Sequence, residues 1–478
     1  MVRIRRLSLS LLLTACGDDV AGSATAGGSA SATGDTTDVS VGQTSAPEPG
    51  TGVTPTTGGP DPTGGPDTST STTSTSTTGA PDTGEPVECT KIEFDDPGLE
   101  IQVQEFLAIK GEVPLEVALA TEELRLFADW QIDGLGGLEC FVNLRVFESD
   151  SAGIIDDLTP LAHLTKLERL MLPSSWVVDL SPLTGLAALT SLDLRVTKLA
   201  DLGPLHELAL VDLSLGRSML ADFTSLAGHP TLTRLTARGL TGTGITGLAQ
   251  LPKLERLSVT DSELADLGAL AGAPALRELD LADNQITSLA PLAGLTTLVE
   301  LHAANNKISS LPAPAGLGEL AILDLGKNQI TDPTPLGQLP SLRELTLDDN
   351  PLTKGITGLA ALTKLERLQV SRTSISKLAA IAPATLVHIG AEDNKIVDLT
   401  PLAEHAALAD LRFARNAIVS VHPIVAAPFW SADPCVRANF RENPLDAESL
   451  DVDLPALCAG GDALEFADQI CADCIPMP

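Results

Sequence analysis

The residues with the most obvious chemistry are the seven cysteines: Cys16, Cys89, Cys140, Cys435, Cys458, Cys471 and Cys474. Thiols can form disulfides, bind zinc or exchange disulfides. The last two form a C-x-x-C pair, but the sequence has no second such pair and no histidine near it. A zinc site or thiol–disulfide catalyst is therefore the alternative. We expect the six cysteines after Cys16 to form structural disulfides, because an even number in an oxidising compartment indicates a disulfide framework.

These six cysteines fall into two groups along the chain. Cys89 and Cys140 lie near the start of the apolar part, the other four lie in the last 44 residues, and none lies between the groups. We predict a Cys89–Cys140 bridge and two bridges among the last four. Six cysteines allow 15 pairings, so spacing alone does not fix the partners.

No other set of residues has the spacing of a catalytic site. The seven histidines are scattered, and the sequence has no H-E-x-x-H, G-x-S-x-G or phosphate-binding glycine motif. Carboxylate pairs such as Asp348–Asp349 fall in turns and do not favour a glycosidase dyad. We therefore predict that the protein is not an enzyme, and that it needs no cofactor and no metal.

The N-terminus has the composition of an export signal. Three arginines precede an apolar run that begins at Leu7 and is too short to cross a bilayer. The stretch LTAC, which ends at Cys16, resembles a bacterial lipobox. This resemblance implies that residues 1–15 are a lipoprotein signal peptide and that Cys16 is lipidated; the alternative is an ordinary signal peptide. It also implies an exported protein, lipid-anchored to the bacterial cell envelope and facing the surface or the periplasm, with no other membrane attachment.

Residues 16–88 are rich in Thr, Ser, Gly and Pro, and no Lys or Arg occurs from Gly17 to Thr90. Such a segment has too little apolar area to offset its chain entropy, so we expect a disordered linker. The formal net charge of the whole chain is −33. Nucleic acids and anionic membranes bind clustered basic residues, so this charge argues against both as partners.

A 22-residue pattern dominates the rest of the chain. Its consensus is L-x-x-L-x-L-x-x-N-x-I-x-x-L-x-P-L-x-x-L, and successive copies start 21 to 23 residues apart. The central apolar residue of each copy, which we call the anchor, recurs about 14 times: Leu124, Phe147, Leu170, Leu192, Leu213, Leu235, Leu257, Leu279, Leu301, Leu323, Leu345, Leu368, Ile389 and Leu411. A fixed period of this length indicates a solenoid.

This pattern looks like the leucine-rich repeat in its short bacterial form, as found in internalin-like surface proteins. The resemblance implies an α/β solenoid, a leucine-rich repeat horseshoe with one parallel sheet on its concave face. It further implies a helical N-terminal cap at residues 89–120, repeats at 121–424 and a cysteine-containing C-terminal cap at 425–478. The apolar residues Ile101, Val103, Phe106 and Leu107 fall close to helical spacing in the first cap.

The residues themselves account for such a coil. Alternation in L-x-L gives one short strand per copy, and stacked copies give a parallel sheet. Recurrent prolines on the opposite wall, such as Pro160 and Pro291, suit a 3₁₀ turn better than a regular helix. The asparagine position follows the strand, where the backbone bends away from its ladder partners. We expect Asn284, Asn306 and Asn328 to satisfy these buried backbone groups, because an amide offers both donors and an acceptor.

The variable positions around each anchor are expected to point outward on the concave sheet and to carry any binding function. They form a basic group, Arg217, Arg234, Arg238 and Arg256, followed by a mainly acidic group, Glu278, Asp280, Asp283, Glu300, His302, Asp324, Glu344 and Asp348. We predict a monomeric, membrane-anchored recognition module for adhesion or ligand binding at the cell surface. Its partner would be a protein or a glycan. The alternative is a structural envelope protein without a single ligand, in which these charges only solvate the sheet.

Overall fold

The computed structural model describes residues 89–470, apart from short gaps at 128–130, 151–152, 174, 196–197, 241–243, 313–315, 379–380, 382–383, 433–435, 460–462 and 467–468. The chain divides into two units, Met1–Ala80 and Pro81–Pro478, and all described residues belong to the second. The signal peptide, the lipidation site Cys16, the linker and three cysteines (Cys435, Cys471 and Cys474) therefore lie outside the described residues.

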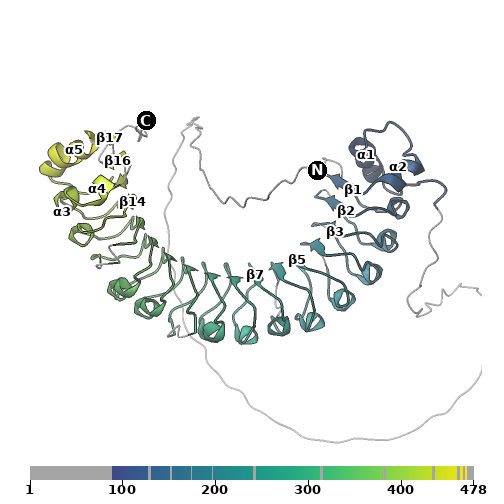
Figure 1. Cartoon of the computed structure of the whole chain (residues 1–478), viewed down its shortest axis with the longest axis horizontal. Coiled ribbons are helices and arrows are strands. Elements are labelled where there is room, and N and C mark those ends of the chain that lie inside the picture. Colours follow the sequence, from purple (N-terminus) through teal and green to yellow (C-terminus); the bar gives the residue numbers. More distant parts are fainter. Residues whose placement is uncertain are drawn as a thin grey trace, which may run out of the picture. The chain divides into compact units, whose positions relative to one another are not determined.

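The second unit is a stack of coils, each of which contributes one short strand to a single sheet (Figure 1). We number each coil by its strand. The strands are β1 Glu123–Leu126, β2 Val146–Ser149, β3 Arg169–Met171, β4 Ser191–Leu194, β5 Asp212–Gly216, β6 Arg234–Arg238, β7 Arg256–Thr260, β8 Glu278–Asp280, β9 Glu300–His302, β10 Ile322–Asp324, β11 Glu344–Thr346, β12 Arg367–Gln369, β13 His388–Gly390, β14 Asp410–Arg412, β15 Arg437–Asn439, β16 Ala463–Phe466 and β17 Gln469–Ile470.

The register of the sheet confirms the repeat pattern. Every pair from β1–β2 to β13–β14 is parallel and aligns one anchor with the next, from Leu124 beside Phe147 to Ile389 beside Leu411. All fourteen anchors are buried, because the L-x-L alternation turns each toward the core. Burial of one leucine side chain contributes about 1.5–3 kcal/mol, so the anchors are a main source of stability.

The opposite wall of the coils consists mainly of 3₁₀ turns, as the prolines predict. These lie on the outer side of the arc in Figure 1, with the strands on the inner side. The turns are η1 Leu138–Cys140, η2 Thr159–Leu161, η3 Ser181–Leu183, η4 Gly203–Leu205, η5 Thr224–Leu226, η6 Leu248–Gln250, η7 Gly268–Leu270, η8 Ala290–Gly294, η9 Thr334–Gln338, η10 Thr357–Ala361 and η11 Thr400–Leu402.

The asparagine prediction is also confirmed, and Asn328 shows how it works. Its Nδ2 donates to the carbonyl oxygens of Ala303 at 2.9 Å, Leu325 at 3.0 Å and Gly326 at 3.1 Å. Its Oδ1 accepts a hydrogen bond from Ile308 N at 3.0 Å. Ala303 and Ile308 belong to the preceding coil, so one side chain satisfies buried backbone groups of two coils.

The N-terminal cap contains two helices, α1 Pro97–Phe106 and α2 Leu115–Ala120. The Asp96 carboxylate caps α1 by accepting from Leu99 N at 2.6 Å. Leu99 and Val103 are buried, but Phe106 is 44% exposed, so its predicted place in the apolar face of this helix is wrong. Phe106 is the last helical residue, and the next residue, Leu107, packs against the core instead.

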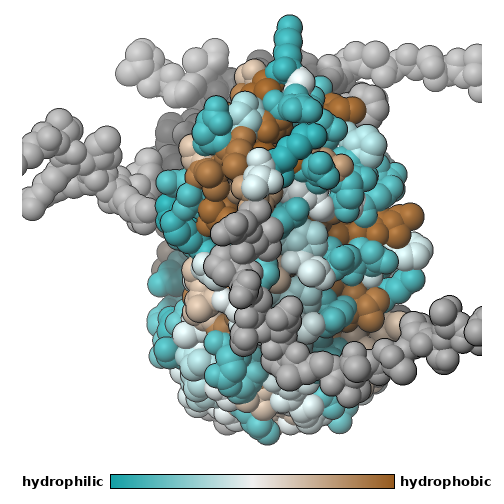
Figure 2. All heavy atoms as spheres, turned by 90° about the vertical axis from the view of Figure 1, so that its right-hand side faces the viewer, coloured by the Kyte–Doolittle hydropathy of each residue, from teal (hydrophilic) through white to brown (hydrophobic). Residues whose placement is uncertain are grey.

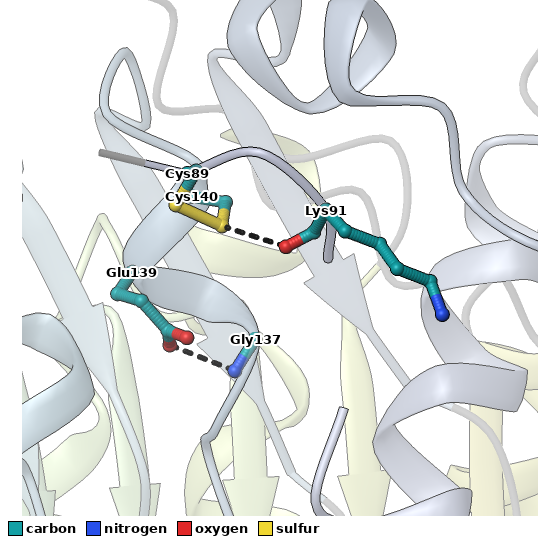
Figure 3. Close-up of a disulfide and its surroundings, with 5 residues drawn as sticks. All are labelled: Cys89, Lys91, Gly137, Glu139 and Cys140. Atoms are coloured by element: carbon teal, nitrogen blue, oxygen red, sulfur yellow. Dashed lines mark hydrogen bonds between the residues drawn. A yellow bond between two sulfur atoms is a disulfide. The ribbon is translucent and has the colours of Figure 1, made fainter. Parts of the chain in front are cut away.

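A disulfide ties the start of this cap to the repeats (Figure 3). Cys89 and Cys140 are bonded as predicted, with their Cα atoms 5.6 Å apart. Nearby, Gly137 has φ 98°, and a Cβ there would lie 2.7 Å from the Phe94 ring. Glycine is therefore needed where the segment after Cys89 crosses the first coil. Cys458 is also disulfide-bonded, which agrees with bridging in the C-terminal group.

The parallel ladder does not end at residue 424, where the sequence pattern stops. Ala438 pairs with Leu411 and Leu464 pairs with Ala438, so β15 and β16 add two coils to the stack. These coils escaped prediction because their anchors come 27 and 26 residues after the preceding ones, and one is alanine. The remaining helices are α3 His422–Val425, α4 Phe429–Ala432, the π-helix η12 Ser449–Asp453 and α5 Leu454–Ala459. Antiparallel β17 then covers the edge of β16.

The buried apolar residues form one continuous cluster from Ile92 to Leu464. Figure 2, which faces the right-hand side of Figure 1, shows a mostly hydrophilic surface with hydrophobic residues exposed in separate groups. Within the described part of the chain, no helix is both long and apolar enough to cross a membrane.

Candidate binding face

The candidate site is the outward face of strands β5 to β11 and of the residues that follow each strand. All twelve predicted residues are exposed or half-buried there, while the anchors between them are buried. Side chains before and after each anchor alternate with it across the sheet, so they form straight rows along the solenoid. One row runs Asp212, Arg234, Arg256, Glu278, Glu300; the next runs Ser214, Thr236, Ser258, Asp280, His302.

A shallow hollow of about 240 Å³ lies where the basic and acidic groups meet. Its polar lining comes from four neighbouring strands: Arg234, Thr236, Arg256, Ser258, Glu278, Asp280, Glu300 and His302. Ser258 Oγ donates to Asp280 at 3.4 Å. The structure thus brings together six of the twelve predicted residues in one concave surface that offers charged and hydroxyl groups.

The predicted basic group is mostly neutralised within the protein. Arg234 Nη1 lies 2.7 Å from Asp212 Oδ2, and Arg256 Nη2 lies 3.0 Å from Glu278 Oε1. Arg238 Nε is 3.9 Å from Asp261 Oδ2. Each pair joins neighbouring coils, so these arginines stabilise the stacking and offer less positive charge to a ligand.

The acidic group differs, because several of its carboxylates have no cationic partner among the described residues. We call these five residues, which span coils 8 to 11, the acidic set: Asp280, Asp283, Glu300, Asp324 and Asp348. Asp324 accepts only from Gly326 N at 2.9 Å, and Glu300 is half-buried beside Glu278. Glu344 is different, since Arg367 Nε lies 3.6 Å from its Oε2.

Asp348 is a half-buried member of the acidic set. It accepts a hydrogen bond from Ser371 N at 2.6 Å. Burial raises the pKa of Asp348, and the nearby carboxylates Asp349 and Asp324 act in the same direction, against the Ser371 hydrogen bond and Arg372. A partner cation placed here would favour the charged form of this carboxylate.

A second charged row follows the end of the strands. In each of many coils the residue four positions after the anchor has positive φ, including Asp349 (57°), Arg372 (57°), Asp393 (56°) and Arg415 (56°). Arg415 reaches back to Asp393 with Nε and Nη2 at 2.5 and 2.8 Å. Arg372 contacts Asp349 in the same bidentate way, so carboxylates one coil earlier neutralise both arginines.

Comparison with known proteins agrees with this geometry. Residues 274–315 match the family described as leucine-rich repeats (2 copies). An internalin, InlF, of Listeria monocytogenes is 25% identical with a TM-score of 0.56, and the match covers 70% of this chain and 94% of that one. The fold is a leucine-rich repeat solenoid. None of the curated protein sequences matches the chain.

Two further solved structures share this leucine-rich repeat fold. A leucine-rich repeat protein of Leptospira interrogans is 19% identical with a TM-score of 0.58, covering 76% of this chain and 94% of that one. A chain of the mouse RP105/MD-1 complex is 21% identical with a TM-score of 0.55, covering 69% of this chain and 60% of that one.

Sequence reasoning missed the counter-ions of this leucine-rich repeat face, Asp212 and Asp261. A signal was present, because Asp212 lies one 22-residue period before Arg234 and the register places the two side by side. It also missed Asn443, whose Nδ2 donates to Phe413 O at 2.8 Å in the coil before it. Among the described residues, no group of three or more His, Cys, Asp or Glu is placed to hold a metal ion.

Proposed function

We propose that this protein is a recognition module whose concave face binds a partner protein through the acidic set. The observation that carries the proposal is the run of five carboxylates in coils 8 to 11 that form no ion pair with any residue the structure describes, beside arginines that are already paired. Such a surface complements a partner that presents lysine and arginine side chains. Internalins and the RP105/MD-1 complex, which share the fold, support a role in protein interaction.

We further propose that the module is exported and tethered to the bacterial envelope by a lipid on Cys16. The LTAC stretch and the arginine-led apolar run before it support this anchor. A linker of roughly 70 residues would extend about 45–50 Å on average, so the module could reach partners away from the membrane. Replacing Cys16 by Ser is expected to move the protein from the membrane fraction to the soluble fraction and to remove the acyl mass from its N-terminus. Retention of both properties in Cys16→Ser contradicts the anchor.

To test the binding proposal, the full chain is used to capture a partner from proteins extracted from cell envelopes. A captured protein is purified, and its affinity is measured at several salt concentrations. The double variant Glu300→Lys/Asp324→Lys is expected to weaken binding at least tenfold, and wild-type binding is expected to weaken as salt rises. Glu404→Lys is the matched control, because Glu404 is exposed in the wall segment after η11 and outside the acidic set.

Two outcomes favour the structural alternative. One is that no saturable partner is recovered at low or physiological salt. The other is that Glu404→Lys weakens binding as much as the double variant, which shows a response to net charge alone. The internal pairing of Arg234 and Arg256 supports a purely structural role for coils 5 to 7, so Arg234→Glu is expected to change stability more than affinity.

A further inference from the structure

A stripe of exposed apolar side chains lies on one flank of coils 2 to 5, beside the concave sheet. Ile154 is 49% exposed, Trp176 46%, Val178 55% and Met219 73%. Lys198, in the coil between Trp176 and Met219, places its Nζ 3.8 Å from the centre of the Trp176 ring. We call Ile154, Trp176, Val178 and Met219 the flank stripe.

Hydrogen bonds place Trp176 and Met219 on one ladder of inter-coil bonds, with Lys198 between them in coil 4. Trp176 N donates to Ile155 O at 2.7 Å, Lys198 N to Val177 O at 3.1 Å, and Met219 N to Leu199 O at 2.7 Å. Each bond joins one coil to the coil before it. Trp176, Lys198 and Met219 therefore occupy successive rungs of one ladder. In coil 2 the corresponding bond runs from Gly153 N to Ile132 O at 2.8 Å, and Ile154 is the residue that follows the donor.

Later coils provide an internal comparison. The same inter-coil hydrogen bond is donated by Gln285, Lys307, Gln329 and Lys395, all of which have polar or charged side chains. A polar residue therefore satisfies this position structurally, and the fold does not require apolar side chains in coils 2 to 5. Exposed apolar residues gathered at one place mark an interaction surface.

The border of the stripe is acidic. Asp157, Asp179, Asp201 and Asp222 each lie one coil apart, and each accepts from a 3₁₀-turn backbone N–H at 2.8–2.9 Å. Asp156, in the coil of Ile154, is exposed and has no hydrogen bond or ion pair among the described residues. An apolar row and an acidic row thus run side by side along the solenoid.

We propose that the flank stripe docks an amphipathic, basic helix of a partner protein. Neighbouring strands are about 4.8 Å apart and the coils diverge toward the outer side of the arc, so the rungs approach the 5.4 Å pitch of an α-helix. Like-facing side chains of an extended segment are about 6.6 Å apart, a poorer match. A helix along the solenoid places apolar side chains on the stripe and lysines or arginines over the acidic row.

Charge complementarity favours a basic helix over two other occupants, a second copy of this chain and an anionic membrane. A second copy of a chain with net charge −33 brings further acidic surface to the acidic border, and an anionic membrane does the same. A basic helix instead gains attraction from the four carboxylates of the acidic row, which outnumber the one cation named on this flank, Lys198 over the Trp176 ring. Trp176 supplies an aromatic anchor of the type that dominates interface energetics.

The test uses the full chain and three synthetic 14-residue peptides, with binding followed by fluorescence anisotropy. The first is a helix with Leu at i, i+4, i+7 and i+11 and Lys along one border; the others replace Leu by Ser or Lys by Glu. We expect saturable binding of the Leu/Lys peptide only. Trp176→Ala/Met219→Ser is expected to weaken it about tenfold or more, and Asp156→Lys several-fold. Gln329→Ala, on the same rung of coil 10, is the control and leaves affinity unchanged.

The proposal is overturned if the Ser/Lys peptide binds as well as the Leu/Lys peptide. It is also overturned if affinity is unchanged in both the Trp176→Ala/Met219→Ser and the Asp156→Lys variants. Two further results contradict the proposal, because each shows another occupant of the stripe. One is dimerisation that depends on Trp176, measured by sedimentation velocity, and the other is binding to phosphatidylglycerol vesicles that depends on Trp176. Circular dichroism confirms that each variant is folded, and Asp156→Lys leaves every 3₁₀ cap in place. Glu300→Lys/Asp324→Lys is expected to leave peptide affinity unchanged, which separates this surface from the concave face.

Discussion

Arg372 holds Asp349 across two adjacent coils, with Nε 2.6 Å from Oδ1 and Nη2 2.8 Å from Oδ2. Both residues have φ near 57°, a conformation that costs a non-glycine residue roughly 1 kcal/mol or more. Two parallel hydrogen bonds between charged groups partly offset this cost. The pair therefore stabilises a turn that the backbone alone disfavours.

Breaking this pair should destabilise the protein modestly and in a pH-dependent way. The hydrogen bond from Arg372 lowers the pKa of Asp349, so the stabilisation is present above the unfolded pKa, about 3.8, and is lost as pH falls through the folded pKa. Because the arginine is about half exposed, we expect Arg372→Met to cost only about 0.5–1 kcal/mol at pH 7. Urea unfolding at pH 7 and pH 3 checks this, and an undiminished difference at pH 3 contradicts it.

Loss of one ladder asparagine should cost far more than loss of an exposed neighbour. Asn328→Ala leaves the buried groups Ala303 O and Ile308 N without their partner, and each unsatisfied group costs about 1–3 kcal/mol. We expect a loss of roughly 3 kcal/mol in the free energy of unfolding. Gln329→Ala, exposed in the same coil, is the control and should change it by less than about 0.5 kcal/mol.

Acidification should destabilise the solenoid through His229. This side chain is buried, its Nδ1 accepts from Leu232 N at 3.2 Å, and burial lowers its pKa. The folded state thus prefers neutral histidine, so stability is complete above the unfolded pKa, about 6.5, and falls as pH drops through the folded pKa. We expect His229→Asn to flatten the stability profile between pH 7.5 and 5. If the profile of the variant is equally steep, the pH dependence comes from another group. The buried His405 is one example, because burial lowers its pKa as well.

Removal of the N-terminal disulfide should loosen the front of the solenoid. The bond closes a loop with a sequence separation of 51, which the chain-entropy treatment values at about 4 kcal/mol. We expect Cys89→Ser/Cys140→Ser to increase amide exchange in α1, α2 and β1, while β10 to β12 keep wild-type protection. Uniform loss of protection along the chain contradicts a local role.

Truncation after residue 424 should leave an unstable end. Phe413 in coil 14 stacks on Phe440 in coil 15, with ring centroids 6.2 Å apart and planes inclined by 12°. Removal of coil 15 exposes Phe413, Leu411 and the open edge of β14, which solenoids normally cover. We expect aggregation or a lower thermal midpoint for residues 1–424 relative to the full chain, measured by light scattering during a thermal scan.

Periodicity made most of the fold predictable. Anchors such as Leu279 and Leu301 fix the strand, its register and its buried face, because one residue type recurs at one spacing. Ala438 and Leu464 were not predictable in this way, since longer coils break the period and a small anchor weakens the apolar signal. Stacking on the previous coil, rather than local sequence, defines those two strands.

The positions of the candidate site were predictable, but its charge was not. The rows around each anchor place Arg234 and Glu300 on the same face, as the period requires. Whether an arginine is free to bind a ligand depends on its side-chain conformation and on the residue at the same position one coil away. Arg234 turns toward Asp212, while Glu300 lies between Glu278 and Ile322 on the neighbouring strands. This difference moves the expected site from the basic to the acidic coils.

The direction of the asparagine bonds gives the solenoid a preferred way to come apart. Each ladder asparagine, from Asn284 to Asn443, reaches the coil before it, so detaching the last coil leaves backbone groups of its predecessor without their partner. Unfolding from the rear therefore removes these partners coil by coil, whereas the Cys89–Cys140 disulfide ties the first coil to the N-terminal cap. When the molecule is pulled by its C-terminus, we expect it to unfold in steps of one coil. Each step of 22 residues should increase the length of the extended chain by about 75 Å.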